Sequence, residues 1–435
     1  MQISSLFYRR RAESGAGRAT LPSNGVDFEI VTDPARFAAL EPEWDRLWAR
    51  SAEPRFTNSF AWRNAGWLST GVPRKRRLAV LVMHVDGALA LIWPMTIGRK
   101  FGLWRQAQPL GPEYTEYEPV VVEAGLQAAD HVARAWAYLR RAMPADMILV
   151  PWVREAAATQ DAVSGDASAR YAETLPSPVV DCRAYPSFED YWGARSSKHR
   201  GNLNRLQRRL GEYGKVEFDR VTDLDEYERL LDWTIRTKLA WMKARHLQND
   251  FLAEPEFRAF AARLAGARTP TGQWGMWALR LDGRVIATTL GALDAYWFEG
   301  FFGAQDPALE SCSLGSIMLL KMLQWLYPRN IGCDLRIGSE DYKRLWATAD
   351  RPATTYRIAN TGWGALGLAI FDWLQQARVT KDRLRERIPK GLRMRFKSLA
   401  RRLTVRLPGS LLQPTTNATD IEPTPVAPVA LAKAT

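Results

Sequence analysis

The sequence predicts an α+β fold built from two similar units in tandem. Two Asp-Gly dipeptides, at 86–87 and 282–283, each lie between two runs of strand-forming residues, which is a strong signal of a β-hairpin. Helical patterns that contain tryptophans precede each hairpin, and a chain of 435 residues is long enough for two or three domains. We therefore expect a diverged duplication with mixed, mostly antiparallel sheets that are flanked by helices.

The first unit is expected over residues 27–180. It opens with the strand-forming run FEIV and continues with a helix, whose start is marked by Asp33 and Pro34 in the order of a cap followed by a proline. The runs LAVLVMHV and ALALIWPM on either side of 86–87 complete its hairpin. Residues 1–26, before the first strand, are expected to be a flexible lead.

The second unit is expected over residues 181–360. Its hairpin pairs WGMWALRL with RVIATTLGAL, and a third strand, YWFEGFF, follows. A loop, a helix over 316–326, the strand CDLRI and the loop GSEDYKRLW come next, so the passage is long enough for a βαβ arrangement. The boundary between the units is expected at 175–186, where prolines interrupt the pattern.

Positive charge is concentrated near the end of the chain, which carries most of the net charge of +13. Apolar residues recur every three or four positions among the basic residues of 378–406, so we expect a basic amphipathic helical extension over 361–407. Such a helix either contacts an anionic membrane surface or docks on its own domain with its basic face in solvent. Nucleic acid is the least favoured partner, because no recognition motif accompanies the charge. Residues 408–435 lack periodicity and are expected to be a disordered tail.

Several classes of protein are disfavoured by composition. No apolar run approaches the about 20 residues of a membrane-spanning helix, and no secretory signal is expected, so we expect a cytoplasmic protein with peripheral contact at the inner face of the cell membrane if the basic helix binds lipid. The three cysteines and four histidines lack the spacing of a metal site or a disulfide framework, and we expect no metal. Cys312 is a possible nucleophile, but buried inert thiols are commoner.

The loop before the helix at 316–326 has the residues of an anion site. Ser311, Ser313, Gly315 and Ser316 are small, and they lie where the free N–H groups and the dipole of a helix favour a phosphate. The competing interpretation is ordinary capping of the helix by Ser313 or Ser316, which needs no ligand.

Taken in order, these motifs resemble the CelD-like acetyltransferase family of polysaccharide and cellulose biosynthesis, a branch of the GNAT superfamily. The C-terminal signature of that family is similar to Asp306-Pro307, the SLGS helix start and GSEDYKRLW. The N-terminal half resembles the family through EWDRLW, AWRNAGW and WPM, and the middle of the chain through FEDYW and KHRGNLNRLQRRL. Leu314 stands where the family has proline, which restores one N–H and leaves the helix start possible.

The resemblance implies a pair of GNAT-like domains and a GNAT-type acyltransferase that uses acetyl-CoA or another acyl-CoA. The acceptor it implies is an amine or hydroxyl of a small molecule or glycan precursor. The implied donor-binding residues are Ser313, Leu314, Gly315, Ser316 and Lys343. Lys198, Arg200 and Arg344 are further candidates for neutralising phosphates, with surface solvation as the alternative.

Four residues are candidates for catalysis: Glu299, Tyr342, Glu340 and Asp306. Tyr342 is the candidate acid that protonates the leaving thiolate, and backbone amides near Glu299 are candidates for stabilising the oxyanion. Glu299 is the first choice for the base, because a carboxylate in the apolar run YWFEGFF is costly unless it is paired or functional. Strand alternation offers a simpler alternative, in which Glu299 faces solvent. For Asp334 a structural ion pair is the better interpretation.

Two other functions remain open at this stage. FemAB-like aminoacyl transferases also pair two GNAT-like domains but take their amino acid from charged tRNA, and a basic chain suits that donor. The excess charge lies in the terminal segment, which favours acyl-CoA. The third possibility is a non-catalytic accessory subunit of a polysaccharide synthesis complex.

Overall fold

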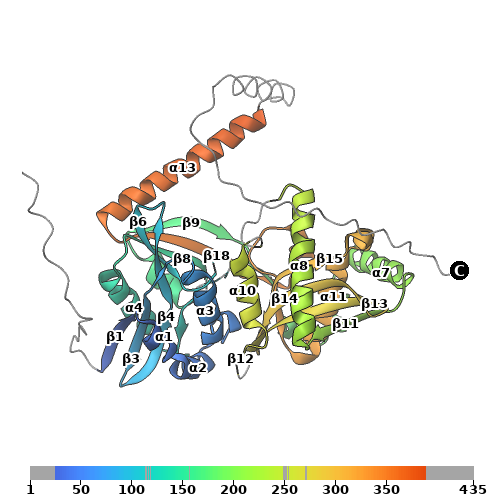
Figure 1. Cartoon of the computed structure of the whole chain (residues 1–435), viewed down its shortest axis with the longest axis horizontal. Coiled ribbons are helices and arrows are strands. Elements are labelled where there is room, and N and C mark those ends of the chain that lie inside the picture. Colours follow the sequence, from blue (N-terminus) through green and yellow to red (C-terminus); the bar gives the residue numbers. More distant parts are fainter. Residues whose placement is uncertain are drawn as a thin grey trace, which may run out of the picture. The chain divides into compact units, whose positions relative to one another are not determined.

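The computed structural model describes residues 25–387, apart from 113, 114, 116, 118, 156, 248–251, 253, 270 and 271. The chain divides near residue 365 into two compact units, of which the first holds all the strands of the described chain. The predicted lead up to residue 24, the predicted extension beyond residue 387 and the tail at 408–435 lie outside the described residues. Figure 1 shows the order of the elements.

The first sheet contains the N-terminal hairpin. Its order is β1(Val26–Val31), β3(Val80–Val85), β4(Ala88–Trp93) and β7(Val121–Val122), and neighbouring strands are antiparallel. Asp86 and Gly87 both have positive φ, 49° and 81°, as a type I′ turn requires. The predicted hairpin and the predicted first strand are therefore confirmed.

The second sheet also belongs mainly to the N-terminal half. Its order is β2(Arg77–Leu78), β5(Met95–Lys100), β6(Trp104–Pro109), β8(Met147–Arg154), β18(Ala353–Ala359) and β9(Ala169–Leu175). The pair β6–β8 is parallel, and the other pairs are antiparallel.

The third sheet carries the C-terminal hairpin. Its order is β11(Val216–Val221), β13(Gly272–Leu281), β14(Arg284–Leu293), β15(Trp297–Gln305), β16(Gly332–Asp334), β10(Pro178–Val180) and β17(Ala349–Asp350), with β12(Arg268–Thr269) paired to β13. The turn at Asp282 and Gly283 repeats the positive φ values of the first hairpin, so the second predicted hairpin is confirmed. Among the described pairs of this sheet, β15–β16 is parallel and the others are antiparallel.

Helices cover both faces of the hairpin in each half. In the N-terminal half these are α1(Pro34–Ala38), α2(Glu41–Ala49), α3(Phe60–Gly66), α4(Ala128–Ala142) and α5(Thr159–Ser164), and the Asp33 carboxylate caps α1 as the sequence predicts. Alternate residues of β3 face opposite ways, so Leu81 packs in the core with α4, whereas Val80 packs with α1, α2 and α3. A core on each face is what fixes the register of this hairpin.

The C-terminal half repeats this two-faced plan. Its helices are α6(Phe188–Gly193), α7(Ser197–Gly211), α8(Leu224–Ala244), α10(Pro255–Leu264), α11(Leu314–Leu326) and α12(Asp341–Trp346). Trp277 packs in the core with α7 and α11, and Trp274 packs in the core with α8 and α10. The core that contains Trp274 also includes Trp62 of α3. The ring centroids of Trp62 and of Phe260 in α10 are 4.8 Å apart, so α3 and α10 lie side by side where the halves meet (Figure 1).

The α+β tandem fold is confirmed, and two of its strands pair across the predicted boundary. The strand β10 ends at the predicted border of 180 and pairs with β16 and β17 of the C-terminal half. The strand β18, expected in the second unit, pairs instead with β8 and β9. The two halves therefore exchange strands, and the domain boundaries at 180 and 360 stay a prediction.

The passage after β15 differs from the prediction in two details. The strand expected over CDLRI ends at Asp334, because Arg336 adopts a left-handed φ of 64° and its amide donates to the Asp334 carboxylate at 2.8 Å. The prediction of a loop over GSEDYKRLW is wrong for its second part, which forms the helix α12. Its residues have good helix propensity, and Trp346 is buried in the core beside α7.

The last described helix is α13(Gly362–Arg387), which confirms helix over the first part of the predicted extension. Throughout the described ranges, every helix is too short or too polar to span a bilayer.

Candidate active site

The parallel pair β15–β16 is short, and β15 continues beyond the end of β16. Pairing is limited to 297–299 of β15 and 332–334 of β16. From Gly300 to Gln305, β15 pairs with β14 on one side, and no described strand pairs with its other side. The last pair of the ladder is Glu299 opposite Asp334, so two carboxylates lie at the end of the ladder.

A guanidinium from the other half of the chain neutralises these carboxylates. Arg55 donates to Glu299 at 3.1 Å and to Asp334 at 3.3 Å, and we call these three residues the Arg55 cluster. Each of the three side chains is at most 2% exposed. The Tyr117 hydroxyl also donates to Asp334, at 2.7 Å, so the N-terminal half supplies two of the groups that hold these acids.

The Glu299 carboxyl can exchange a proton near neutral pH. Burial raises its pKa to about 7, with the lowering effect of Arg55 opposed by Asp334 and Asp294. The alternative that Glu299 points to solvent is therefore wrong, because both the side chain and its partners are enclosed. A buried carboxyl with such a pKa is suited to accept a proton at neutral pH.

The helix α11 begins with strained backbone. Ser313 is its N-cap residue and has φ 50° and ψ 54°, a left-handed conformation that costs a non-glycine residue about 1–2 kcal/mol. Within the described chain its hydroxyl makes no capping hydrogen bond, so ordinary capping does not account for this serine. A side chain at Gly315 would meet the end of the Gln305 side chain at 2.6 Å, so a larger residue there would displace the Gln305 amide.

This helix start opens into a cavity of about 1010 Å³ between α8, α11 and α12, which we call the α8–α11 cavity. Five of the predicted site residues line it: Asp306, Ser313, Gly315, Ser316 and Tyr342. The structure thus brings together residues that the sequence places as far apart as 306 and 342. The volume of the α8–α11 cavity is at the upper end of the range typical of ligand cavities, which is about 300–1,000 Å³. The cavity is therefore large enough for a donor of the size of acyl-CoA.

Three cations of α8 and its C-terminal end line the same cavity, and the sequence reasoning missed them. These are Arg236, Lys238 and Arg245. Burial and the neighbouring Arg245 lower the pKa of Lys238. Lys238 and Arg245 lie over the Trp241 ring at 4.3 and 4.4 Å, and Arg245 is ion-paired with Glu310. The run TIRTKLAWMKAR, basic and aromatic along one helix, was the available signal.

The remaining predicted donor-binding residues have other surroundings. Leu314 is fully buried, so only its backbone amide is suited to bind a ligand. The Lys343 ammonium donates to the carbonyls of Arg336 and Ile337 at 3.0 and 2.9 Å and is ion-paired with Glu340 at 3.0 Å. These contacts hold the loop between β16 and α12.

The other acids and cations considered from sequence lie outside this cavity, except Asp306. Glu299 and Glu340 are not among the residues that line it, and neither are Lys198, Arg200 and Arg344. Asp306 caps the turn before α11 through the amide of Ala308 at 2.9 Å and is ion-paired with Arg284 at 2.6 Å. Its carboxylate therefore organises the rim.

Tyr342 of α12 lines the cavity. The residue is 53% exposed, and partial burial, with Glu340 nearby, raises its pKa above the ordinary value of a phenol. A raised pKa keeps the hydroxyl protonated at neutral pH, and a protonated phenol can donate to a thiolate.

The described residues include no group of three or more His, Cys, Asp or Glu side chains arranged to hold a metal ion. Cys182, Cys312 and Cys333 are free and buried, and burial raises the pKa of Cys182 to about 12 and that of Cys333 well above its ordinary value. Cys312 is enclosed in the core with α11, as expected for an inert thiol.

The segment that contains this geometry matches a known family. Residues 197–344 match the model described as the acetyltransferase (GNAT) domain. This segment is similar to a GNAT acetyltransferase domain. It runs from α7 to α12 and includes β15, α11 and Tyr342, so the predicted GNAT-type transferase is confirmed at this level. A search of curated proteins finds no match to the chain.

Solved structures resemble the chain beyond the GNAT domain. The crystal structure of FemX is similar with a TM-score of 0.51 and 8% identity, over 77% of this chain and 98% of that one. The C-terminal domain of a putative lysylphosphatidylglycerol synthetase from Agrobacterium fabrum gives 0.49 and 12%, over 77% and 95%. A tandem GNAT protein from the clavulanic acid biosynthesis pathway gives 0.41 and 12%, over 77% and 99%. At this identity the likeness to FemX shows a common fold and no common substrate.

Proposed function

We propose that this protein transfers an acyl group from acyl-CoA to an amine or hydroxyl acceptor. The observation that carries the proposal is the start of α11 at Ser313, which opens into a cavity lined by Arg236, Lys238 and Arg245. The amides at a helix start and the three cations are suited to bind the phosphates of the donor. The cavity is close in size to such a ligand.

In the proposed reaction the acceptor attacks the thioester carbonyl, the C–S bond breaks, and the thiolate leaves. The Tyr342 phenol gives its proton to the thiolate, and the amides of the open edge of β15 stabilise the oxyanion. The proton of the acceptor passes to Glu299 through a hydroxyl or a water molecule, because Glu299 is itself enclosed. Asp306 and Glu340 act by holding the rim and the loop beside Tyr342 through their ion pairs.

The biological setting we propose is the biosynthesis of polysaccharide or another cell-envelope glycan, with a glycan precursor as acceptor. The support for this is the resemblance of the sequence to CelD-like enzymes. A FemAB-like aminoacyl transferase is the second candidate, favoured by the fold that the chain shares with FemX. Both candidates use a phosphate-bearing donor, and the accessory-subunit alternative keeps donor binding without turnover, so binding and turnover must be measured separately.

Acetyl-CoA at 100 times its dissociation constant should raise the melting temperature by about 5 °C, because a ligand of the native state stabilises it by about 2.7 kcal/mol under these conditions. The variant Arg236→Ala/Lys238→Ala should lose most of this shift. Arg229→Ala is the matched control, since Arg229 is an exposed arginine of α8 that does not line the cavity. Differential scanning fluorimetry with and without acetyl-CoA measures the three shifts.

The outcomes of this experiment separate the candidates. A shift of the same size in the double variant and in the Arg229 control would remove the α8–α11 cavity as the donor site. No shift with acetyl-CoA, together with tRNA binding that weakens steeply as salt is added, would favour the aminoacyl transferase. A shift without CoA release in the presence of amino sugars, glycan precursors and amines would favour the accessory subunit.

For the basic C-terminal segment we propose contact with anionic lipid, which is one of the two alternatives that the sequence leaves open. Helix α13 supports this, because Leu366, Ile370, Trp373 and Leu374 recur at helical spacing and are exposed on it. Truncation after Gln376 should reduce binding to phosphatidylglycerol vesicles at least tenfold, since each cation near an anionic surface contributes about 1 kcal/mol. Vesicle sedimentation measures the effect, and truncation after Pro408, which keeps the basic segment, is the control. Equal sedimentation of the two truncated forms would leave only the docked-helix alternative.

A further inference from the structure

The turn between β5 and β6 exposes large apolar side chains. Lys100 at the end of β5 pairs with Trp104 at the start of β6. The amide of Leu103 donates to the carbonyl of Lys100 at 3.1 Å, so the connection is tight. Phe101 is 61% exposed and Leu103 is 58% exposed. Neither residue lines the α8–α11 cavity, so this feature lies outside the proposed donor site.

Phe101 has an unfavourable backbone conformation as well as an exposed ring. Its φ is 51° and that of Gly102 is 71°, which are values of a type I′ turn. Asparagine and glycine are favoured at the first central position of such a turn, whereas a left-handed φ is rare for a bulky residue. Asparagine would therefore suit both the turn and the solvent better. Neither burial nor local conformation accounts for phenylalanine here, which points to a function of the ring.

A tryptophan from the first turn of α13 lies at the same end of this hairpin. The Trp363 ring stacks on that of Trp104, with centroids 5.4 Å apart, and its carbonyl accepts the Trp104 indole N–H at 3.0 Å. Trp104 directly follows Leu103, and Trp363 is itself 49% exposed. Three exposed apolar side chains thus belong to this end of the hairpin. We call Phe101, Leu103 and Trp363 the apolar tip.

Basic residues lie beside the apolar tip. Arg99 and Lys100 end β5, immediately before Phe101. In the neighbouring strand β2, Arg77 pairs with Ile97 of β5. Because β2 runs antiparallel to β5, the chain before Arg77 leads toward the tip, and Lys75 lies on that side. We call Lys75, Arg77, Arg99 and Lys100 the tip cations.

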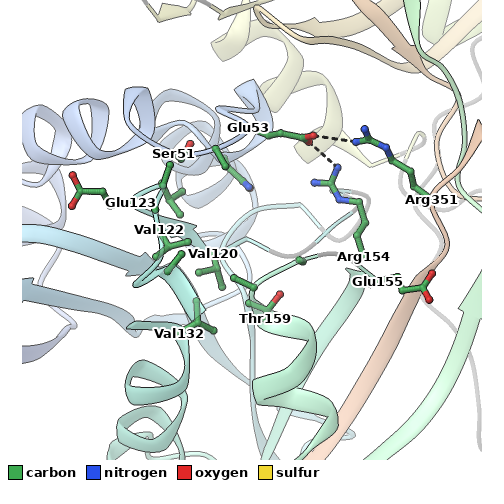
Figure 2. Close-up of a pocket in the computed structure, with 18 of the residues that line it drawn as sticks. Ser51, Glu53, Val120, Val122, Glu123, Val132, Arg154, Glu155, Thr159 and Arg351 are labelled. Atoms are coloured by element: carbon green, nitrogen blue, oxygen red, sulfur yellow. Dashed lines mark hydrogen bonds and ion pairs between the residues drawn. The ribbon is translucent and has the colours of Figure 1, made fainter. Parts of the chain in front are cut away.

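The tip cations have no acidic partner. None of the four makes an ion pair with a carboxylate in the part of the chain that the structure describes. Other arginines of this half are paired: Arg105 contacts Asp146 at 2.9 Å, and Arg154 and Arg351 face Glu53 at 3.5 and 3.1 Å (Figure 2). The charge beside the tip is therefore available to an anionic surface.

An anionic membrane surface suits both features. Exposed aromatic and aliphatic side chains are favoured at the boundary of headgroups and acyl chains, and cations beside them attract anionic headgroups. A small free anion would pair with the cations and leave the apolar tip in water. A nucleic acid would neutralise the cations but offers no apolar phase for Leu103.

We propose that the β5–β6 turn contacts an anionic membrane. The apolar tip enters the interfacial region of the bilayer, and the tip cations lie among its headgroups. This contact does not depend on the transfer reaction. It is also separate from the lipid contact of the basic C-terminal segment, because all of its residues belong to the first compact unit. Two such contacts attach a protein to a membrane more stably than one.

Vesicle sedimentation of the full chain tests the apolar tip. Phe101→Asn/Leu103→Asn should weaken binding to phosphatidylglycerol vesicles at least tenfold, because two large apolar side chains no longer enter the bilayer. The melting temperature should stay the same or rise, since asparagine suits the first position of the turn. Leu126→Asn, at a fully exposed leucine of another loop, is the matched control. Equal binding of the double variant and this control would overturn the proposal.

A second pair of variants tests the tip cations. Lys75→Gln/Lys100→Gln should weaken binding to phosphatidylglycerol vesicles at least tenfold and leave binding to phosphatidylcholine vesicles unchanged. Arg208→Gln/Arg209→Gln removes the same charge from exposed positions of α7 and should weaken binding less than twofold. Equal losses in the two double variants would mean that only net charge matters, which would overturn the proposed contact.

Insertion of the tip distinguishes a membrane from a protein partner. A polarity-sensitive fluorophore attached at Leu103→Cys should emit at shorter wavelength with phosphatidylglycerol vesicles, whereas the same label at Leu126→Cys should not. The native cysteines are buried, so they stay unlabelled in the folded protein. No shift at 103, or loss of self-association in Phe101→Asn/Leu103→Asn with unchanged vesicle binding, would assign the tip to a protein contact and overturn the proposal. Truncation after Gln376 reports separately on the C-terminal segment.

Discussion

Replacing Arg55 with methionine should lower the free energy of unfolding at pH 8 by about 3–5 kcal/mol, because it leaves two buried carboxylates without their cation. Glu299 and Asp334 are each at most 2% exposed, and both are bonded to this one guanidinium. Methionine keeps most of the length and apolar surface of the arginine stem, so the loss reports mainly on charge. Urea unfolding followed by circular dichroism measures it.

The stability lost in Arg55→Met should be smaller at acidic pH than at alkaline pH. The pKa of Glu299 is raised by burial to about 7 in the folded protein, above that of an unfolded glutamate. Folding therefore favours the protonated carboxyl, and the stability contributed by Glu299 is present below the unfolded pKa and is lost as pH rises through about 7. Without Arg55 the charged form is still less favourable, so the variant should lose less stability at pH 5.5 than at pH 8.

Two further variants test whether the loss of stability comes from the unpaired buried charges. Glu299→Gln added to Arg55→Met should recover part of the loss at pH 8, because one of the unpaired charges is removed. Arg258→Met is the matched control: Arg258 pairs with Asp232 at 2.7 Å, but both side chains are nearly half exposed, and such pairs contribute about 0–1 kcal/mol. A loss of the same size for Arg55→Met at both pH values would contradict a pH-dependent charge at Glu299.

Features that depend on neighbouring residues could be predicted from the sequence, whereas contacts between residues far apart in the chain could not. Glu299 was identified because a carboxylate interrupts an apolar strand, and the hairpins because Asp-Gly turns are local signals. The partner of Glu299 is Arg55, 244 positions away, and no local pattern links them. Their meeting depends on how the two halves pack, which is specified by contacts such as Trp62 with Phe260.

The cations of α8 were missed for a related reason. Arg236 and Lys238 have the chemistry of ordinary solvated residues of a charged helix, and only the position of α11 makes them part of a cavity wall. Lys343 shows the opposite case, because a motif position predicted a ligand contact whereas its ammonium is bonded to backbone carbonyls. A basic residue in a motif can thus hold the loop that shapes a site, and sequence alone does not separate the two roles.

Tyr342→Phe should lower kcat of acyl transfer about 100-fold and change KM for acyl-CoA less than twofold, because general acid catalysis typically contributes about 10²–10⁴-fold and the ring still lines the cavity. CoA release, measured with the most active acceptor from a panel of amino sugars, glycan precursors and amines, gives both constants. The melting temperature should stay the same, since Tyr342 is half exposed and its hydroxyl is not needed for packing. Tyr213→Phe, at an exposed tyrosine outside the cavity, is the control.

The leaving group separates an acid from a residue that only shapes the site. A thioester of a more acidic thiol, such as a thiophenyl donor, needs little protonation as it departs, so Tyr342→Phe should lose much less activity with it than with acyl-CoA. A purely structural role predicts the same loss for both donors. An equal loss, or an unchanged kcat with acyl-CoA, would exclude Tyr342 as the acid. In that case a water molecule in the α8–α11 cavity would be left to protonate the thiolate, and the helix start and the α8 cations would still serve to bind the donor.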